Sequence, residues 1–338
     1  MDTPPLVRPP LPAYQDRRTG LKVFGILEII LGAFCALMLP LMVLGQVIAA
    51  KQNATAVDFA LAAPALLTFS ALAVGLVWLG IGSMQARRWA RALLLCLGWM
   101  GLCVGLCSLA VMIPTLGSMG EMMRQQGREA PSGAIAFAKI FIIATITVIY
   151  VLIPGAMVLF YRSVNVKLTC EACDPAERWT DRCPLPVLAM CILQASGAIY
   201  VVLMPRFGAA MPLAGFLVTG WLARIVWFGF AGLSAYAAWG FYRLKPSVWL
   251  LYTIAIVVFG LSSTVTFLRI DLLDYYRAVG MPESQIKQIA VSPLVHGHMI
   301  VWMTGFGVAF FGGYLLYLRR YFLGTNRSSV TPSAGQFD

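Results

Sequence analysis

Long apolar segments alternate with short polar ones along the whole chain. Eight of the apolar segments reach the length of about 20 residues that a helix needs to cross the hydrocarbon core of a bilayer. We expect these helices at residues 21–48, 59–84, 92–116, 137–161, 185–204, 216–242, 248–268 and 298–317. The pattern therefore predicts an all-α integral membrane protein with eight transmembrane helices.

Basic residues gather in every second polar segment. They lie before the first span, between the second and third, and after the fourth, the sixth and the eighth. The other connecting segments carry mixed charge or almost none. Because basic loops stay on the cytoplasmic side, we expect a multi-pass protein of the plasma (cytoplasmic) membrane with both termini in the cytoplasm.

The second half of the chain repeats features of the first half in the same order. We interpret this order as a tandem duplication of a four-helix unit. Because four is even, both copies enter the membrane from the same side, which makes the repeats parallel. The matched pairs are Gly25–Phe34 with Cys191–Tyr200, Gly80 with Gly240, Trp89 with Trp249, Gly105 with Gly260, Glu121–Gly127 with Asp274–Gly280, and Gly155 with Gly312.

The repeat and the polar segments together predict five parts. Two of them are four-helix membrane units, one is a cytoplasmic linker between the units, and two are disordered cytoplasmic tails. They are the tail 1–20, the first unit 21–162, the linker 163–184, the second unit 185–322 and the tail 323–338.

Composition agrees with a membrane protein and argues against a soluble one. Of the 338 residues, 60% are hydrophobic and only 12% are charged, whereas soluble domains carry about 25% charged residues. The net charge is +11, but the basic residues flank the apolar spans, where they contact anionic lipid. We therefore expect membrane lipids as partners, together with a membrane-protein partner or a second copy of the chain, and no nucleic acid.

Two polar residues lie inside predicted spans. Glu28 is an acid about two turns from Lys22, and its counterpart in the repeat is Gln194. A carboxylate in a bilayer is costly, so Glu28 is paired, protonated or in contact with water. We favour a structural role, in which Glu28 contacts Arg18 or Arg88 or forms a hydrogen bond between helices. The alternative is a coupling site for a proton or cation, with Glu28 and Gln194 as transport candidates.

The linker carries three cysteines, Cys170, Cys173 and Cys183. Asp174 followed by Pro175 and Glu177 has the pattern of a capping box, which predicts a helix from there to Arg182. A Cys-x2-Cys pair with a third cysteine is a candidate zinc site, although a fourth ligand is missing. A redox role is a further alternative. Over both alternatives we favour the interpretation that the three cysteines bind no metal and belong to a structured linker. We therefore predict no cofactor.

Candidate polar residues also lie on the predicted outer face. His296 and His298 stand at the start of the last span, and Asp271 precedes it in the same external segment. The segments 121–127 and 274–280 place an acid and an arginine three residues apart before a glycine, which predicts either a short amphipathic surface helix or an ordered loop.

Small residues at helical spacing predict close helix packing within the units, at Gly75, Gly80, Gly101, Gly105, Gly229 and Gly232.

Three classes of function stay open. We favour a non-catalytic assembly or sensory membrane protein that acts through its linker and external helices, because the spans contain few polar residues. The alternatives are a pathway for a small solute between the two four-helix units, and a membrane enzyme that modifies lipid. The motifs of phosphate-binding loops, zinc proteases and serine hydrolases do not occur. We therefore predict no catalytic residues and expect a protein that is not an enzyme.

Overall fold

The computed structural model describes residues 14–52, 59–117, 131–203, 210–281, 283–290 and 299–323. Within these residues, eight helices are long and apolar enough to cross a membrane. The predicted number and order of long helices are confirmed. Many large apolar side chains on them are exposed, as is typical of helices that contact lipid. A single short hairpin is the only β-structure in the described residues.

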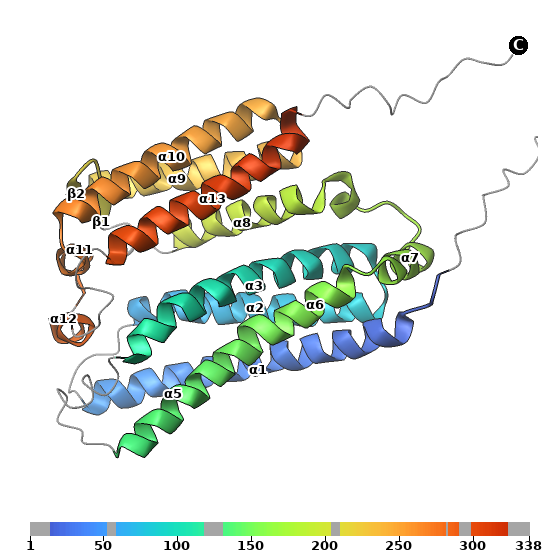
Figure 1. Ribbon diagram of the computed structural model, residues 1–338, viewed down its shortest axis with the longest axis horizontal. Coiled ribbons are helices and arrows are strands. Elements are labelled where there is room, and N and C mark those ends of the chain that lie inside the picture. The colour runs from blue at the N-terminus through green and yellow to red at the C-terminus, as the bar shows by residue number, and fades with distance from the viewer. Residues whose placement is uncertain are drawn as a thin grey trace, which may run out of the picture. The chain divides into compact units, whose positions relative to one another are not determined.

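The chain forms two compact units (Figure 1). One contains Met1–Leu102 and Leu152–Arg182, and the other contains Cys103–Val151 and Cys183–Asp338. The elements are α1 Arg18–Gln52, α2 Phe59–Met84, α3 Arg88–Gly117, α5 Ser132–Thr147, η1 Val148–Leu152, α6 Ile153–Tyr161, α7 Val164–Cys173, η2 Trp179–Arg182, α8 Leu185–Leu203, β1 Ala210–Leu213, β2 Phe216–Thr219, α9 Gly220–Tyr242, α10 Pro246–Arg269, α11 Leu272–Ala278, α12 Glu283–Ala290 and α13 Met299–Leu323.

In the first unit, α1 and α2 approach each other through glycines. A Cβ atom on Gly25 would lie 2.7 Å from the carbonyl oxygen of Gly80, and one on Gly80 would lie 2.6 Å from the carbonyl oxygen of Gly25. The two backbones are therefore in contact at this point, which only glycine on both helices permits. The predicted packing role of Gly80 is confirmed, whereas Gly75, Gly229 and Gly232 have no neighbour within 4 Å of a Cβ position.

Two turns at the basic ends of the helices have the same geometry. The turn from α2 to α3 has Ala86 at φ 53°, and the turn from α9 to α10 has Leu244 at φ 52°. In each turn the amide after this residue donates to a glycine carbonyl, Arg87 to Gly82 and Lys245 to Gly240, both at 2.9 Å. These are the hydrogen bonds of a helix that ends in the left-handed conformation.

The matched glycines Gly105 and Gly260 also occupy similar positions. Gly105 on α3 faces the backbone of Tyr150 in η1, and Gly260 on α10 faces the side chain of Val308 on α13. In both places, a Cβ atom on the glycine would overlap the neighbouring segment. Gly105 and Gly260 therefore permit a close approach of α3 to η1 and of α10 to α13.

The fourth predicted span is one helical segment with an irregular middle. It runs from α5 through the π-helical η1 into α6. Pro154 has no N–H to donate to the carbonyl of Tyr150 four residues earlier, so the α-helical hydrogen-bond ladder cannot continue through this point. The proline accounts for the change of helix type at η1.

The sixth span begins later than predicted. Residues 216–219 are strand β2, which pairs antiparallel with β1 in the register Ala210 to Thr219. The turn residues Ala214 and Gly215 have φ values of 49° and 90°, as a tight two-residue hairpin turn requires. Their amides donate to Ser262 Oγ at 2.6 Å and Thr266 Oγ1 at 2.9 Å on α10, which fixes the hairpin to that helix.

The segment after α10 contains two short helices. α11 includes the predicted pair Asp274 and Arg277, which lie 2.8 Å apart, and it ends before Gly280 at φ 85°. The prediction of a short helix here is confirmed, while its counterpart at residues 121–127 lies outside the described residues. Arg277 also pairs with Glu283 at 3.1 Å, at the start of the helix α12 that the sequence did not predict.

Candidate functional site

The linker is folded and lies across the end of the first unit at which α1 begins (Figure 1). The amide of Arg17 donates to Thr169 Oγ1 at 3.1 Å, and the amide of Gln15 donates to Asn165 Oδ1 at 3.3 Å. Both acceptors are on α7, so the chain just before α1 is tied to the linker helix. The linker is thus part of the first unit and not an extended tether.

The predicted capping box is wrong. Asp174 does not open a helix: it is the residue after the last turn of α7, with φ −130° and ψ 79°. Pro175 disfavours a helical conformation at the residue before it, which ends α7 there. Of the predicted helix to Arg182, only the single 3-10 turn η2 forms.

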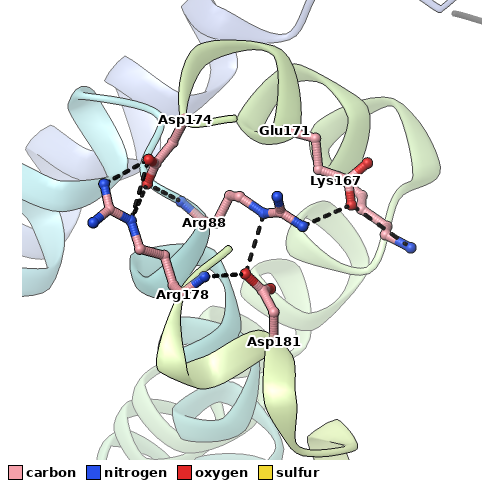
Figure 2. A network of polar contacts seen from close by, with 6 residues as sticks. All are labelled: Arg88, Lys167, Glu171, Asp174, Arg178 and Asp181. Atoms are coloured by element: carbon pink, nitrogen blue, oxygen red, sulfur yellow. Dashed lines mark hydrogen bonds and ion pairs between the residues drawn. The ribbon is translucent and has the colours of Figure 1, made fainter. Parts of the chain in front are cut away.

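Asp174 is instead the buried centre of a polar network (Figure 2). Its side chain is 3% exposed, and it accepts hydrogen bonds from Arg178 Nη2 at 2.6 Å and Arg178 Nε at 3.1 Å. It also accepts from the amide of Arg88 at 3.4 Å, so the carboxylate lies at the N-terminus of α3, where the helix dipole favours negative charge. The hydrogen bonds from Arg178 lower the pKa of Asp174 below its ordinary value.

The side chain of Arg88 joins two further acids of the linker. It pairs with Asp181 at 3.2 Å and with Glu171 at 3.7 Å, and Glu171 also contacts Lys167 at 3.8 Å (Figure 2). Arg88 is 17% exposed, so these pairs are shielded from water more than ordinary surface ion pairs are. Asp181 additionally accepts from the amide of Arg178 at 2.9 Å. The network therefore joins α3, α7 and η2 into one body.

The three linker cysteines differ in burial. No set of three His, Cys, Asp or Glu side chains in the described part of the chain is placed to hold a metal ion. Cys170 is buried on α7, and burial raises the pKa of its thiol to about 12. Cys183 is buried as well, and a hydrogen bond with Cys191 lowers the pKa of its thiol. Cys173 is partly exposed.

Glu28 is 1% exposed, and its neighbours are hydroxyl groups from two other helices. Tyr161 Oη at the end of α6 lies 2.8 Å from Glu28 Oε1, and Ser83 Oγ on α2 lies 2.6 Å from Tyr161 Oη. Glu28 Oε2 is buried without a partner. The expected contact with Arg18 or Arg88 is wrong, because Arg88 is engaged by the linker, while the expected hydrogen bond between helices is present.

Gln194 on α8 has a similar environment in the second unit. It is 5% exposed, and its Oε1 accepts a hydrogen bond from Tyr252 Oη on α10 at 2.6 Å. Gln194 Nε2 lies 3.4 Å from the sulfur of Met190. Both transport candidates are thus buried side chains that contact a tyrosine hydroxyl.

Of the three outer-face candidates, the structure describes only Asp271. His296 and His298 lie outside the described residues. Asp271 caps α11, since its Oδ1 accepts from the amide of Leu273 at 3.2 Å. Its carboxylate therefore has a local structural partner.

Sequence reasoning missed several residues of these sites. Tyr161, Ser83 and Tyr252 stand in apolar helices, where hydroxyl-bearing residues are common and carry no signal of their partners. Arg91, in the basic segment before the third predicted span, interacts electrostatically with Glu171 and Asp181 of the linker. The excess of acids in the linker opposite a basic loop is the signal that could have indicated this network.

Comparison with known proteins adds no relative to this description. No protein-family model, no curated protein and no solved structure matches the chain. Any function for the chain must therefore be argued from its own residues.

Proposed function

We propose that this chain is a non-catalytic multi-pass membrane protein that acts in assembly or sensing through its linker. The observation that carries the proposal is the ion-paired linker itself. Arg88, Asp174 and Arg178 hold α7 and η2 against α3 with shielded charge pairs. A linker that only joins two membrane units needs no such network, whereas a surface that another protein recognises must be held in one conformation.

We further propose that the two membrane units arose by tandem duplication. The equal turns at Ala86 and Leu244 support this origin, since they lie 158 residues apart and have the same hydrogen bonds. The close contacts of Gly105 and Gly260, 155 residues apart, are a second correspondence. A duplicated pair of bundles with the linker at the seam presents the linker on the cytoplasmic side, as the distribution of basic residues predicts.

The proposal is tested by placing a photo-activated crosslinking residue at Glu177, which is exposed in the linker between Asp174 and Arg178. We expect a discrete protein adduct in cells, with a second copy of the chain as one outcome that identifies the partner. The same residue at Leu159, which is 74% exposed on α6, is the matched control and is expected to label lipid. Labelling of lipid alone at Glu177 would contradict the proposal.

A second candidate function is the movement of a small solute across the membrane. The observation that favours it is Glu28 Oε2, a buried acid oxygen without a partner. Purified protein in vesicles with a pH gradient would dissipate the gradient faster than empty vesicles, and Glu28→Gln would abolish the difference. Equal rates in wild-type and empty vesicles would exclude proton movement as this function.

A further inference from the structure

The three polar contacts around Glu28 form one continuous chain inside the first unit. Ser83 Oγ lies 3.0 Å from the backbone oxygen of Leu21, Ser83 Oγ lies 2.6 Å from Tyr161 Oη, and Tyr161 Oη lies 2.8 Å from Glu28 Oε1. The chain joins α1, α2 and α6, and its three side chains are all at most 1% exposed. Each of the three distances lies within the range of an O–H···O hydrogen bond.

Counting hydrogens along this chain determines the charge of Glu28. A backbone carbonyl only accepts, so the hydrogen of Ser83 is used toward Leu21. Tyr161 must then donate its one hydrogen to Ser83. With an ionised Glu28, Tyr161 donates to Oε1, and the contact between Tyr161 and Ser83 then has no hydrogen if Ser83 donates to Leu21. If all three contacts are hydrogen bonds, the donor to Tyr161 is therefore the carboxyl group of Glu28. All three contacts are satisfied together only when Glu28 carries a proton on Oε1.

The surroundings of Glu28 agree with a neutral side chain. None of the ion pairs among the described residues includes Glu28. Its contact from α6 is the neutral hydroxyl of Tyr161, which in turn contacts the neutral hydroxyl of Ser83 on α2. Lys22, the next basic residue on α1, is exposed. The remaining oxygen, Oε2, has no donor, which is far less costly for a carbonyl oxygen than for a charged carboxylate.

The second unit places a neutral side chain beside a tyrosine hydroxyl, although there the tyrosine donates, from Tyr252 Oη to Gln194 Oε1. Gln194 is the counterpart of Glu28 in the repeat, and it too contacts a buried tyrosine hydroxyl, that of Tyr252. A glutamine side chain has the shape and the donor and acceptor groups of a protonated glutamic acid. This comparison rests on the proposed duplication, whereas the hydrogen count does not.

We propose that Glu28 is a proton-binding site, occupied at neutral pH, in which the bound proton sets the direction of a hydrogen-bond chain through Tyr161 and Ser83 to the backbone of Leu21. When the proton is bound, each group donates toward Leu21. When it leaves to solvent, the Glu28 carboxylate can only accept, so Tyr161 turns toward Glu28 and Ser83 turns toward Tyr161. The hydrogen bond from Ser83 on α2 to Leu21 on α1 is then lost, which couples protonation to the contact between these helices.

Infrared spectroscopy of the purified full-length protein in lipid tests this proposal. At pH 7 we expect a C=O stretching band of a protonated carboxyl group, because acids exposed to water are ionised at that pH. Glu28→Gln should remove this band, and Gln194→Glu should add a second one. A difference spectrum between wild type and Glu28→Gln that contains only carboxylate bands would overturn the proposal.

A second variant keeps the test decisive if Glu28→Gln does not fold. Tyr161→Phe removes the acceptor of the Glu28 proton, so the carboxyl band should shift to the higher frequency of a group without a hydrogen bond. Thr68→Val is the control, since Thr68 bonds only to the backbone oxygen of Pro64 on its own helix, and it should leave the band unchanged. A band that is absent, or that does not move in Tyr161→Phe, contradicts the proposed chain.

Discussion

Replacement of Asp174 by Asn should open the linker without disturbing the membrane helices. The substitution keeps the size of the side chain and removes the charge that accepts from Arg178 at 2.6 Å and 3.1 Å. A hydrogen bond to a charged group contributes about 1.5–3 kcal/mol. Removal of one partner of a fully buried pair costs about 3–5 kcal/mol. Arg178 is 37% exposed and regains water when the pair is lost, so we expect the smaller cost of about 1.5–3 kcal/mol.

Hydrogen exchange of the amides of α7 measures this opening directly, because local opening determines their exchange rate. A loss of about 1.5–3 kcal/mol corresponds to a rate increase between about tenfold and about 100-fold. Asp16→Asn is the matched control: Asp16 pairs with Arg18 at 3.7 Å, both side chains are more than half exposed, and exchange should not change. Wild-type exchange rates in Asp174→Asn would refute the assignment of Asp174 as the centre of the network.

The same pair gives the linker a defined dependence on pH. Arg178 lowers the pKa of Asp174 in the folded linker relative to its ordinary value of 3.8. The folded state therefore binds a proton less readily than the opened state, and the stabilisation is complete above that ordinary value. It is lost as the pH falls through the lower pKa of the folded state. The intrinsic rate of amide exchange itself falls with pH, so the measured quantity is the protection factor of the α7 amides. It should decrease below about pH 4 in wild type and decrease less in Asp174→Asn, which has no carboxylate at this position to protonate.

Three further predictions concern packing, backbone strain and exposed charge. Gly260→Ala places a Cβ atom against Val308 and should destabilise the second unit by about 1–3 kcal/mol, whereas Gly229→Ala, which meets nothing, should not lower the midpoint of thermal unfolding. Ala86→Gly should raise the midpoint of thermal unfolding. Relief of the left-handed conformation contributes about 1–2 kcal/mol, which exceeds the entropic cost of glycine of about 0.4–1 kcal/mol. An unchanged or lower midpoint would contradict this. Arg277→Ala removes two exposed ion pairs, which solvent screens, so it should lower the midpoint only slightly. High salt should abolish the difference from wild type.

The apolar pattern predicted the long helices well because membrane spans carry a strong signal of length. The second span was predicted at residues 59–84, which are the bounds of α2. The same signal misled at residues 216–219, since an apolar run of four residues is compatible with a strand as well as a helix. The strand forms because it pairs with β1 and because the turn amides donate to Ser262 and Thr266. The local sequence reveals neither contact.

The candidate sites were predictable by residue type but not by partner. Glu28 was identified because an acid is rare in a span, yet its contact Tyr161 is 133 residues away and has no sequence feature that connects the two. Asp174 was identified as a cap because Asp followed by Pro is typical of a helix start. Its actual partners, Arg178 and the amide of Arg88, depend on how α3 and the linker meet, which is a property of the fold.

The lengths of the helices have a consequence for the bilayer in which the chain is placed. The 35 residues of α1 and the 19 residues of α8 correspond to about 52 Å and about 28 Å at 1.5 Å per residue. A hydrocarbon core of about 30 Å matches the length of α8 with little tilt. Even when tilted by 40°, α1 would extend about 40 Å along the membrane normal. Part of α1 must therefore stand outside the hydrocarbon, and no single membrane thickness suits both helices. Hydrophobic mismatch at α1 makes the first unit the part of the protein that responds to a change in bilayer thickness.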